Sequence, residues 1–194
     1  MPLETTVSVP SIKLIPALIF IFDFYPMSST LYDAHFGRTG LNLQPKREVP
    51  LHQVAEKVLW GYVSQITSAL NTIHNLSLSA RLIDAKKILL TAKMRIRLNC
   101  CSILDVIHPE DSPLLERQQK DFQQFGRLML MLSCHSFAQT DNVESSLGSV
   151  ASSYSFDFHN LLTYLLSNEG ERSIGQILRI SAPYILQNLE LSFK

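Results

Sequence analysis

The stretch from Ile73 to Asp105 constrains the fold most, because a helix end, a loop and a hairpin follow one another in it. The apolar repeat of a long helix ends where this stretch begins, at Ile73. Two short apolar runs, Ile88 to Leu90 and Ile96 to Leu98, stand at its end. Such runs, separated only by Thr91 to Arg95, predict a β-hairpin. One short hairpin among helices indicates an α+β fold that is mostly α.

Helices are predicted on both sides of this stretch. Pro50 opens the longest one, and apolar residues recur at helical spacing from Val54 to Ile73. Asp121 to Cys134 is predicted to be a buried helix, because its second half is apolar on every side. The other expected helices run from a cap at Ser28, Ser29 or Thr30 to about Phe36, over Phe156 to Leu166, from the capping box at Ser173, and from Ser181 with Pro183.

The apolar run from Leu14 to Phe22 is too short to cross a bilayer, which takes roughly 20 residues, and Pro16 breaks it. It also lacks the charge and cleavage pattern of a signal peptide. We therefore expect no membrane contact and interpret Ala17 to Phe22 as a buried strand. Residues 1–16 are expected to be an irregular lead-in. Surface loops are expected over Gly37 to Val49, His108 to Gln119 and Ser136 to Ser155.

Composition favours one globular domain. The 194 residues are 46% hydrophobic and carry zero formal net charge, so no global basic field favours nucleic acid. Three cysteines form neither a disulfide framework nor a metal pair, which favours a reducing compartment, cytosol or nucleus. One basic cluster could attract RNA or an acidic partner, although a solvated hairpin face explains it as well. Its members are Arg81, Lys86, Lys87, Lys93, Arg95 and Arg97.

From Ala17 onwards, the order of these elements resembles the C-terminal lobe of a protein kinase, with the N-terminal lobe missing. Three blocks, LIFIFDFYPMSSTLYDAHF, ARLIDAKKILL and RIRLNCCSILDV, are similar to the pseudokinase domain of the regulatory subunit of the poly(A)-nuclease deadenylation complex. The resemblance implies a pseudokinase C-lobe over residues 17–189. In the family a coiled coil follows, so residues 190–194 are expected to be a truncated end.

The resemblance also implies that the chain is not an enzyme. A working kinase needs an Asp in H-R-D, a magnesium-binding Asn, and an Asp in D-F-G. In this chain the H-R-D positions fall on Ala80, Arg81 and Leu82, the Asn on Lys87, and D-F-G on Cys100, Cys101 and Ser102. No catalytic residue and no metal ligand is therefore expected. Asp121, at the start of the helix that resembles helix F of kinases, is expected to accept backbone N–H groups from the loop. Arg172 is expected to pair with a group other than the usual Glu.

ATP bound without phosphoryl transfer is the implied cofactor. The residues carried over from the family are Asp23, Phe24, Tyr25, Pro26, Met27, Ser28, Ser29 and Thr30 of the hinge, with Lys86 and Lys87. Lys86 stands where the family usually has a hydroxyl residue. Two ammonium groups beside the phosphates neutralise charge that magnesium would otherwise balance. The alternative is that Lys86 and Lys87 only occupy a solvated turn.

The partners implied by the resemblance are the catalytic exonuclease subunit and, through regions outside this chain, poly(A)-binding protein and poly(A) RNA. The family forms homodimers and is cytoplasmic, including P-bodies. The implied role is regulatory and scaffolding, in the shortening of messenger RNA tails.

Three alternatives stand beside this hypothesis. The first is a residual phosphotransferase with Asp84 as its base, and the second is a helical adaptor that binds no nucleotide. The third is a nucleophilic enzyme built on a thiolate–imidazole pair. The possible pairs are Cys100 or Cys101 with His108, and Cys134 with His135.

Overall fold

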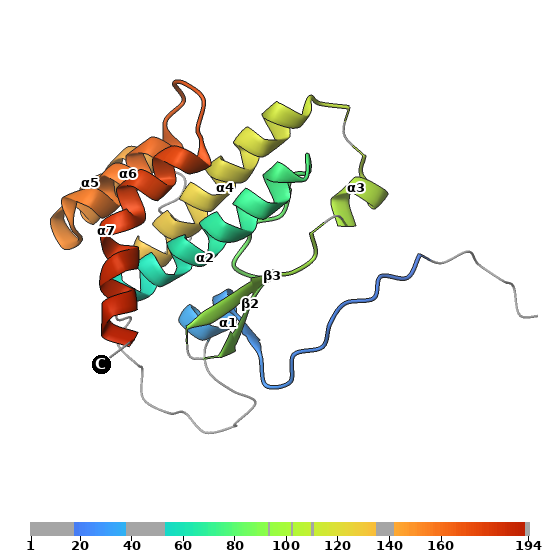
Figure 1. Ribbon diagram of the computed structural model, residues 1–194, viewed down its shortest axis with the longest axis horizontal. Helices are drawn as coiled ribbons and strands as arrows, with labels where there is room; N and C mark the ends of the chain where they lie inside the picture. Colours follow the sequence, from blue (N-terminus) through green and yellow to red (C-terminus); the bar gives the residue numbers. More distant parts are fainter. Residues whose placement is uncertain are drawn as a thin grey trace, which may run out of the picture.

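The two longest helices form the middle of the molecule. The computed structural model describes residues 18–37, 53–92, 94–101, 103–109, 111–134 and 142–192, and the side chains only to residue 186. α2 (Glu56–Asn75) and α4 (Leu114–Cys134) lie side by side (Figure 1). α5 (Val143–Ser153), α6 (Phe156–Leu166) and α7 (Ile174–Ser192) cover them on one side. A mostly helical fold with one small sheet is confirmed.

The predicted apolar face of α2 is the centre of the core. Leu59, Val63 and Leu70 are completely buried, and Ile66 is 1% exposed. The helix begins at Glu56, later than predicted, because residues 53–55 are described and are not helical; Pro50 itself lies outside the described residues. With 21 residues against 20, α4 rather than α2 is the longer helix. The apolar second half of α4 is buried as predicted, since it packs against α2, α5 and α6.

The predicted hairpin is the main part of a three-stranded antiparallel sheet. β2 (Ile88–Ala92) pairs with β3 (Arg95–Leu98), and β1 (Ser29–Thr30) adds to the other edge of β2. Ile96 is buried against α2, whereas its neighbours Arg95 and Arg97 are exposed. This alternation is the one that a strand with one covered face requires. α1 (Leu31–His35) follows β1 directly, with the predicted cap at Thr30.

The prediction of a buried strand up to Phe22 is wrong for the residues that the structure describes. Residues 18–25 have no strand structure, and Ile19 and Ile21 are 79% and 91% exposed. A strand is stable only when a neighbouring strand accepts its backbone hydrogen bonds. In the described part of the chain, every paired strand belongs to the β1–β3 sheet, and residues 18–24 pair with none of them.

Four helices differ from the prediction. α3 (Ile103–Ile107) was not predicted, and α4 begins at Leu114, inside the expected loop over 108–119. α5 occupies most of the expected loop over 136–155, because Asn142 caps it and Val150 packs into the core. α7 is one helix rather than two, with Pro183 inside it. Stacking of Trp60 on Tyr184, with centroids 4.1 Å apart, holds that part of α7 against α2.

The remaining helix predictions are confirmed. α6 has the predicted bounds, and the Ser155 hydroxyl caps it by accepting the Phe158 N–H. Ser173 caps α7 by accepting the Gln176 N–H. None of the described helices is both long enough and apolar enough to span a lipid bilayer.

Candidate nucleotide site

The loop that follows α2 is fixed by one buried carboxylate. Asp121 of α4 is completely buried, and its two oxygens accept the backbone N–H groups of Ala80 and Arg81, each at 2.7 Å. His74, at the end of α2, adds a contact of 2.9 Å from its Nε2. The predicted structural role of Asp121 is therefore confirmed. Sequence reasoning missed His74, since nothing near it in the sequence points to α4.

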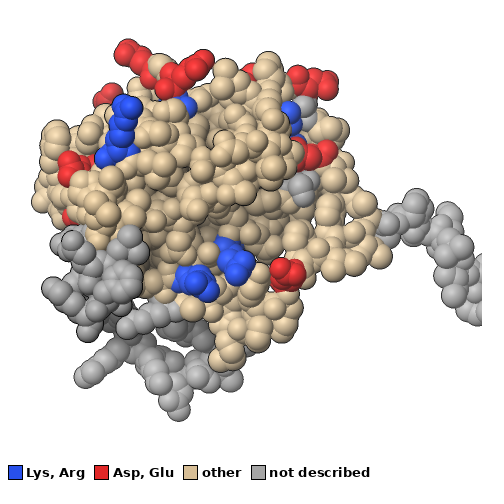
Figure 2. Space-filling view, viewed as in Figure 1, with Lys and Arg blue, Asp and Glu red and all other residues tan. Residues whose placement is uncertain are grey.

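The side chain of Arg81 is turned inward, which changes the predicted basic cluster. Its guanidinium donates to Asp105 of α3 at 2.7 Å and to the carbonyl of His108 at 3.0 Å, and the residue is 8% exposed. Arg81 is therefore not part of an exposed basic surface. On the face that Figure 2 shows, Lys and Arg form a few small groups rather than one continuous basic band. Lys93 lies outside the described residues.

The predicted hinge and the predicted lysine turn lie next to each other. Pairing of β1 with β2 sets Ser29 opposite Leu90 and Thr30 opposite Leu89. One residue further on, the Tyr32 N–H donates to the carbonyl of Ala85 at 2.9 Å. Residues 29–30 are therefore held beside the turn that carries Lys86 and Lys87, although more than fifty residues separate them along the chain.

The turn itself is shaped by Asp84. Its carboxylate accepts the N–H of Lys86 at 2.7 Å, and its carbonyl accepts the N–H of Lys87 at 2.9 Å. Both lysines are exposed, and the Nζ of Lys86 lies 5.1 Å from the centroid of the Tyr32 ring. The carboxylate of Asp84 is thus already engaged in forming the turn.

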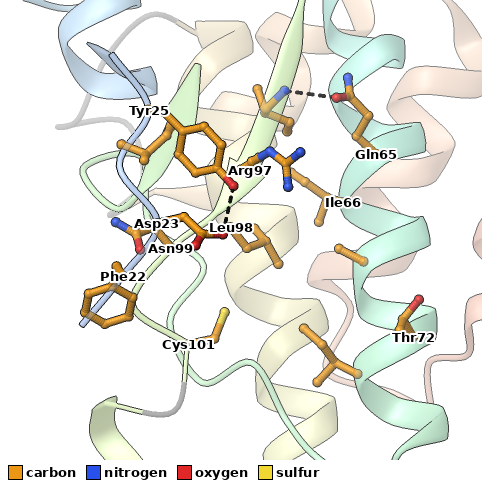
Figure 3. Close-up of a pocket in the computed structure, with 14 residues that line it drawn as sticks. Phe22, Asp23, Tyr25, Gln65, Ile66, Thr72, Arg97, Leu98, Asn99 and Cys101 are labelled. Atoms are coloured by element: carbon orange, nitrogen blue, oxygen red, sulfur yellow. Dashed lines mark hydrogen bonds between the residues drawn. The ribbon is translucent and has the colours of Figure 1, made fainter. Parts of the chain in front are cut away.

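A pocket of about 520 Å³ lies between the hinge, α2 and β3 (Figure 3). Its apolar wall comes mainly from Ile66, Ala69 and Ile73 of α2 and Leu98 of β3. Of the ten predicted nucleotide contacts, Asp23 and Tyr25 line this pocket, whereas the other eight lie outside its lining. The remaining lining residues are Phe22, Gln65, Thr72, Leu89, Ile96, Arg97, Asn99 and Cys101.

Polar contacts at the rim of this pocket tie the hinge to the hairpin. The Tyr25 hydroxyl donates to Asp23 at 3.3 Å, and the Arg97 guanidinium lies over the Tyr25 ring at 4.9 Å. Figure 3 shows Tyr25 and Arg97 on the same side of the pocket. The Gln65 side chain accepts the N–H of Ile96 at 2.9 Å, which joins α2 to β3. Arg97 is exposed, as predicted for the polar side of the hairpin, and its guanidinium also contacts the hinge through the Tyr25 ring.

Left-handed backbone conformations mark the segments around the site. Among the described non-glycine residues, positive φ occurs at Met27, Arg81 and Cys100, with values of 62°, 57° and 62°, and also at Ser77. Such conformations cost about 1–3 kcal/mol each and persist only where surrounding contacts impose them. At Arg81 those contacts are the bonds to Asp121 and Asp105.

Two of the three thiols, those of Cys101 and Cys134, do not resemble activated nucleophiles. Burial raises the pKa of the Cys101 and Cys134 thiols, whereas a nucleophilic cysteine needs a lowered pKa. His135 lies outside the described residues. Arg172 donates from Nε to the carbonyl of Leu165 at 2.8 Å, which identifies a partner other than Glu, as expected. Among the described residues, no three His, Cys, Asp or Glu side chains are grouped as a metal site requires.

The chain is similar in sequence to fungal subunits named PAN3. It is 36% identical over 187 residues to the PAN2-PAN3 deadenylation complex subunit PAN3 of Cryptococcus neoformans, which covers 90% of this chain and 27% of that protein. The same subunit of Chaetomium globosum is 40% identical over 185 residues, 92% of this chain and 28% of that protein. The chain thus spans about a quarter of the length of these relatives. No protein-family model matches it.

Solved structures agree with these relatives. The Neurospora crassa PAN3 pseudokinase matches with a TM-score of 0.73 and 32% identity, over 88% of this chain and 42% of that one. A complex of Neurospora crassa PAN2 with PAN3 matches with a TM-score of 0.75 and 31% identity, over 88% and 42% of the two chains. The Drosophila melanogaster PAN3 pseudokinase matches with a TM-score of 0.75 and 28% identity, over 87% and 44%.

Proposed function

Because this chain belongs to the PAN3 pseudokinase family, we propose that it is part of the regulatory subunit of a deadenylation complex. We further propose that it binds ATP without transferring its phosphate. The identities of 36–40% to PAN3 subunits support the first half of the proposal. A matching PAN3 chain has been seen in complex with PAN2, which supports the exonuclease subunit as the partner. Poly(A)-binding protein, poly(A) RNA, a homodimer and a cytoplasmic or P-body location remain predictions of the same resemblance.

One observation carries the ATP part of the proposal. Ser29 and Thr30, at the end of the predicted hinge, and the turn with Lys86 and Lys87 come from distant parts of the sequence, and the β1–β2 pairing with the Tyr32–Ala85 hydrogen bond holds them side by side. In the proposed complex the base lies along the hinge, and the phosphates contact the ammonium groups of Lys86 and Lys87, which are both exposed. Phosphate groups bind ammonium groups through charge-assisted hydrogen bonds.

The chemistry around these lysines supports binding rather than transfer. Leu82, Lys87 and Cys100 occupy the aligned kinase positions that normally carry oxygen ligands and the proton acceptor, and none of the three supplies a carboxylate. Asp84 is the nearest acid in the loop, but its carboxylate accepts the Lys86 N–H. The two lysines would then balance the phosphate charge in place of magnesium.

The test is calorimetric titration of the intact chain with ATP, in magnesium and in excess EDTA. We expect binding that does not require magnesium and that weakens at least about tenfold in Lys86→Ala/Lys87→Ala, because two charge-assisted contacts are lost. Lys57→Ala, an exposed lysine on α2, is the matched control and should bind as the wild type does. Absence of ATP binding by the wild type would overturn the proposal in favour of a nucleotide-free adaptor.

The residual phosphotransferase is separated from this proposal by a transfer assay with γ-labelled ATP. We expect no labelled product with the wild type. Transfer that disappears in Asp84→Ala would identify Asp84 as the base and would overturn the pseudokinase assignment.

A further inference from the structure

We propose that Tyr32 is a positioning residue for the phosphates of the bound nucleotide, because its ring holds the ammonium group of Lys86. This inference rests on the proposed ATP site and adds a residue that the sequence hypothesis did not include. Lys86 Nζ lies 5.1 Å from the centroid of the Tyr32 ring. At that distance an ammonium group is attracted by the negative face of an aromatic ring.

The Tyr32 ring is a fixed support rather than a mobile side chain. It is half-buried against the core, and the Phe36 ring packs on it with centroids 6.0 Å apart. The backbone of Tyr32 is fixed as well, since its N–H donates to the carbonyl of Ala85 at 2.9 Å. The ring and the start of the lysine turn are thus locked to each other by a hydrogen bond that does not involve Lys86.

The turn fixes the other end of the contact. The N–H of Lys86 donates to the Asp84 carboxylate at 2.7 Å, so the backbone from which the Lys86 side chain leaves is held in place. A free lysine side chain loses considerable rotamer entropy when it binds a phosphate. A side chain already confined over a ring has lost part of that freedom before the ligand arrives, which strengthens binding.

The contact leaves the Lys86 ammonium available to a ligand. Lys86 remains exposed, and a ring face occupies only one side of an ammonium group that carries three N–H donors. In the described part of the chain, the other basic group over an aromatic face is Arg97 over Tyr25, at the pocket side of the hinge. Because Tyr32 contacts Lys86, which is proposed to bind phosphate, loss of the Tyr32 ring should weaken binding of the phosphates. Binding of the nucleoside, proposed to lie along the hinge, should not change.

The experiment compares ATP with adenosine, which lacks the phosphates. Dissociation constants are measured by calorimetry for the wild type, Tyr32→Leu, Tyr32→Phe and Lys86→Ala. We expect Tyr32→Leu to weaken ATP binding about threefold, the usual strength of an exposed cation–π contact. Adenosine affinity should stay within about 1.5-fold, and Tyr32→Phe should keep wild-type ATP affinity because the ring face remains.

Two further variants separate positioning from a merely structural role. Pentafluorophenylalanine at position 32 keeps the shape of the ring but removes its negative face, so it should weaken ATP binding about threefold. This variant tests the contact even if Tyr32→Leu folds poorly. When Lys86→Ala is already present, adding Tyr32→Leu should cause no further loss of ATP affinity, because the contact between Lys86 and the Tyr32 ring is already absent.

The outcomes distinguish the two proposals. A wild-type chain that binds no ATP overturns the proposed function, and the role of Tyr32 with it. A wild-type chain that binds ATP, together with unchanged ATP affinity in Tyr32→Leu and in the fluorinated variant, overturns only the role of Tyr32. Equal losses for ATP and adenosine also overturn it, since the ring would then act on the hinge.

Discussion

At the scale of single residues, Asp121 has the largest structural role in the candidate site. An ionised carboxylate only accepts hydrogen bonds, and the three groups facing Asp121 are two backbone N–H groups and the Nε2 of His74. An amide side chain would direct its NH₂ group at one of the donors. The residue therefore fixes the loop geometry on which Arg81 and the following turn depend.

Asp121→Ala should lower the free energy of unfolding by at least about 2 kcal/mol. The substitution leaves two buried backbone donors unpaired, and each unpaired donor costs about 1–3 kcal/mol. Urea denaturation followed by far-UV circular dichroism measures the loss. Glu116→Ala, which removes an exposed carboxylate on the same helix, is the control and should change stability by about 0.5 kcal/mol or less. Equal losses in the two variants would contradict the structural role of Asp121.

At the scale of elements, close packing between helices sets how they are arranged. α4 and α6 approach closely at Gly126, where an added Cβ would lie 2.9 Å from the Cβ of Leu165 and 3.0 Å from the Cγ of Leu166. Contacts that short force the helices or their side chains to move. Gly126 therefore sets the distance between the two helices.

Gly126→Ala should destabilise the protein by about 1–3 kcal/mol, the usual cost of overpacking. Gly148→Ala in α5 is a matched control with the opposite expected sign, because nothing lies within 4 Å of its added Cβ. There the better helix propensity of alanine should stabilise the protein by about 0.5–1 kcal/mol. Thermal unfolding of both variants against the wild type measures the difference. If Gly126→Ala stabilised the protein instead, α6 would be able to move away from α4 without loss of packing energy, and the proposed role of Gly126 would be wrong.

Elements with a strong apolar period were predictable from sequence, and those held by tertiary packing were not. α6 and the β2–β3 hairpin carry their own signals, whereas α5 is rich in serine and forms because Val150 reaches the core. Pro183 argued for a helix break, but the stacking of Trp60 on Tyr184 supports a continuous α7. In each failure a contact from a distant segment outweighs local preference.

The candidate site was predictable to a similar extent. Resemblance to the pseudokinase family placed Asp121 opposite the loop, and the structure confirms it. The family also supplied the hinge and the two lysines. It gave no sign of the inward Arg81–Asp105 pair or of Tyr32 beneath Lys86, because both depend on how segments far apart in sequence meet.

At the scale of the whole molecule, the part of the chain that the structure describes has an exposed apolar segment at residues 18–24. Leu18, Ile19, Ile21 and Phe24 are each at least 60% exposed. Segments of this kind, rich in β-branched and aromatic residues with little charge, associate with one another through their edges. A molecule with zero net charge also has little electrostatic repulsion to oppose association. The chain should therefore self-associate through residues 18–24.

Ile19→Lys/Ile21→Lys should reduce this self-association strongly. Both side chains are largely exposed, so the free energy of unfolding should change by about 0.5 kcal/mol or less, while light scattering at high protein concentration falls. Leu76→Lys/Leu186→Lys is the matched control, since it adds the same charge at residues that are 67% and 61% exposed. If both double variants reduce scattering equally, net charge rather than the apolar segment governs association. A fall confined to the first variant places the contact between molecules in residues 18–24, the stretch that overlaps the start of the proposed nucleotide hinge at Asp23 and Phe24.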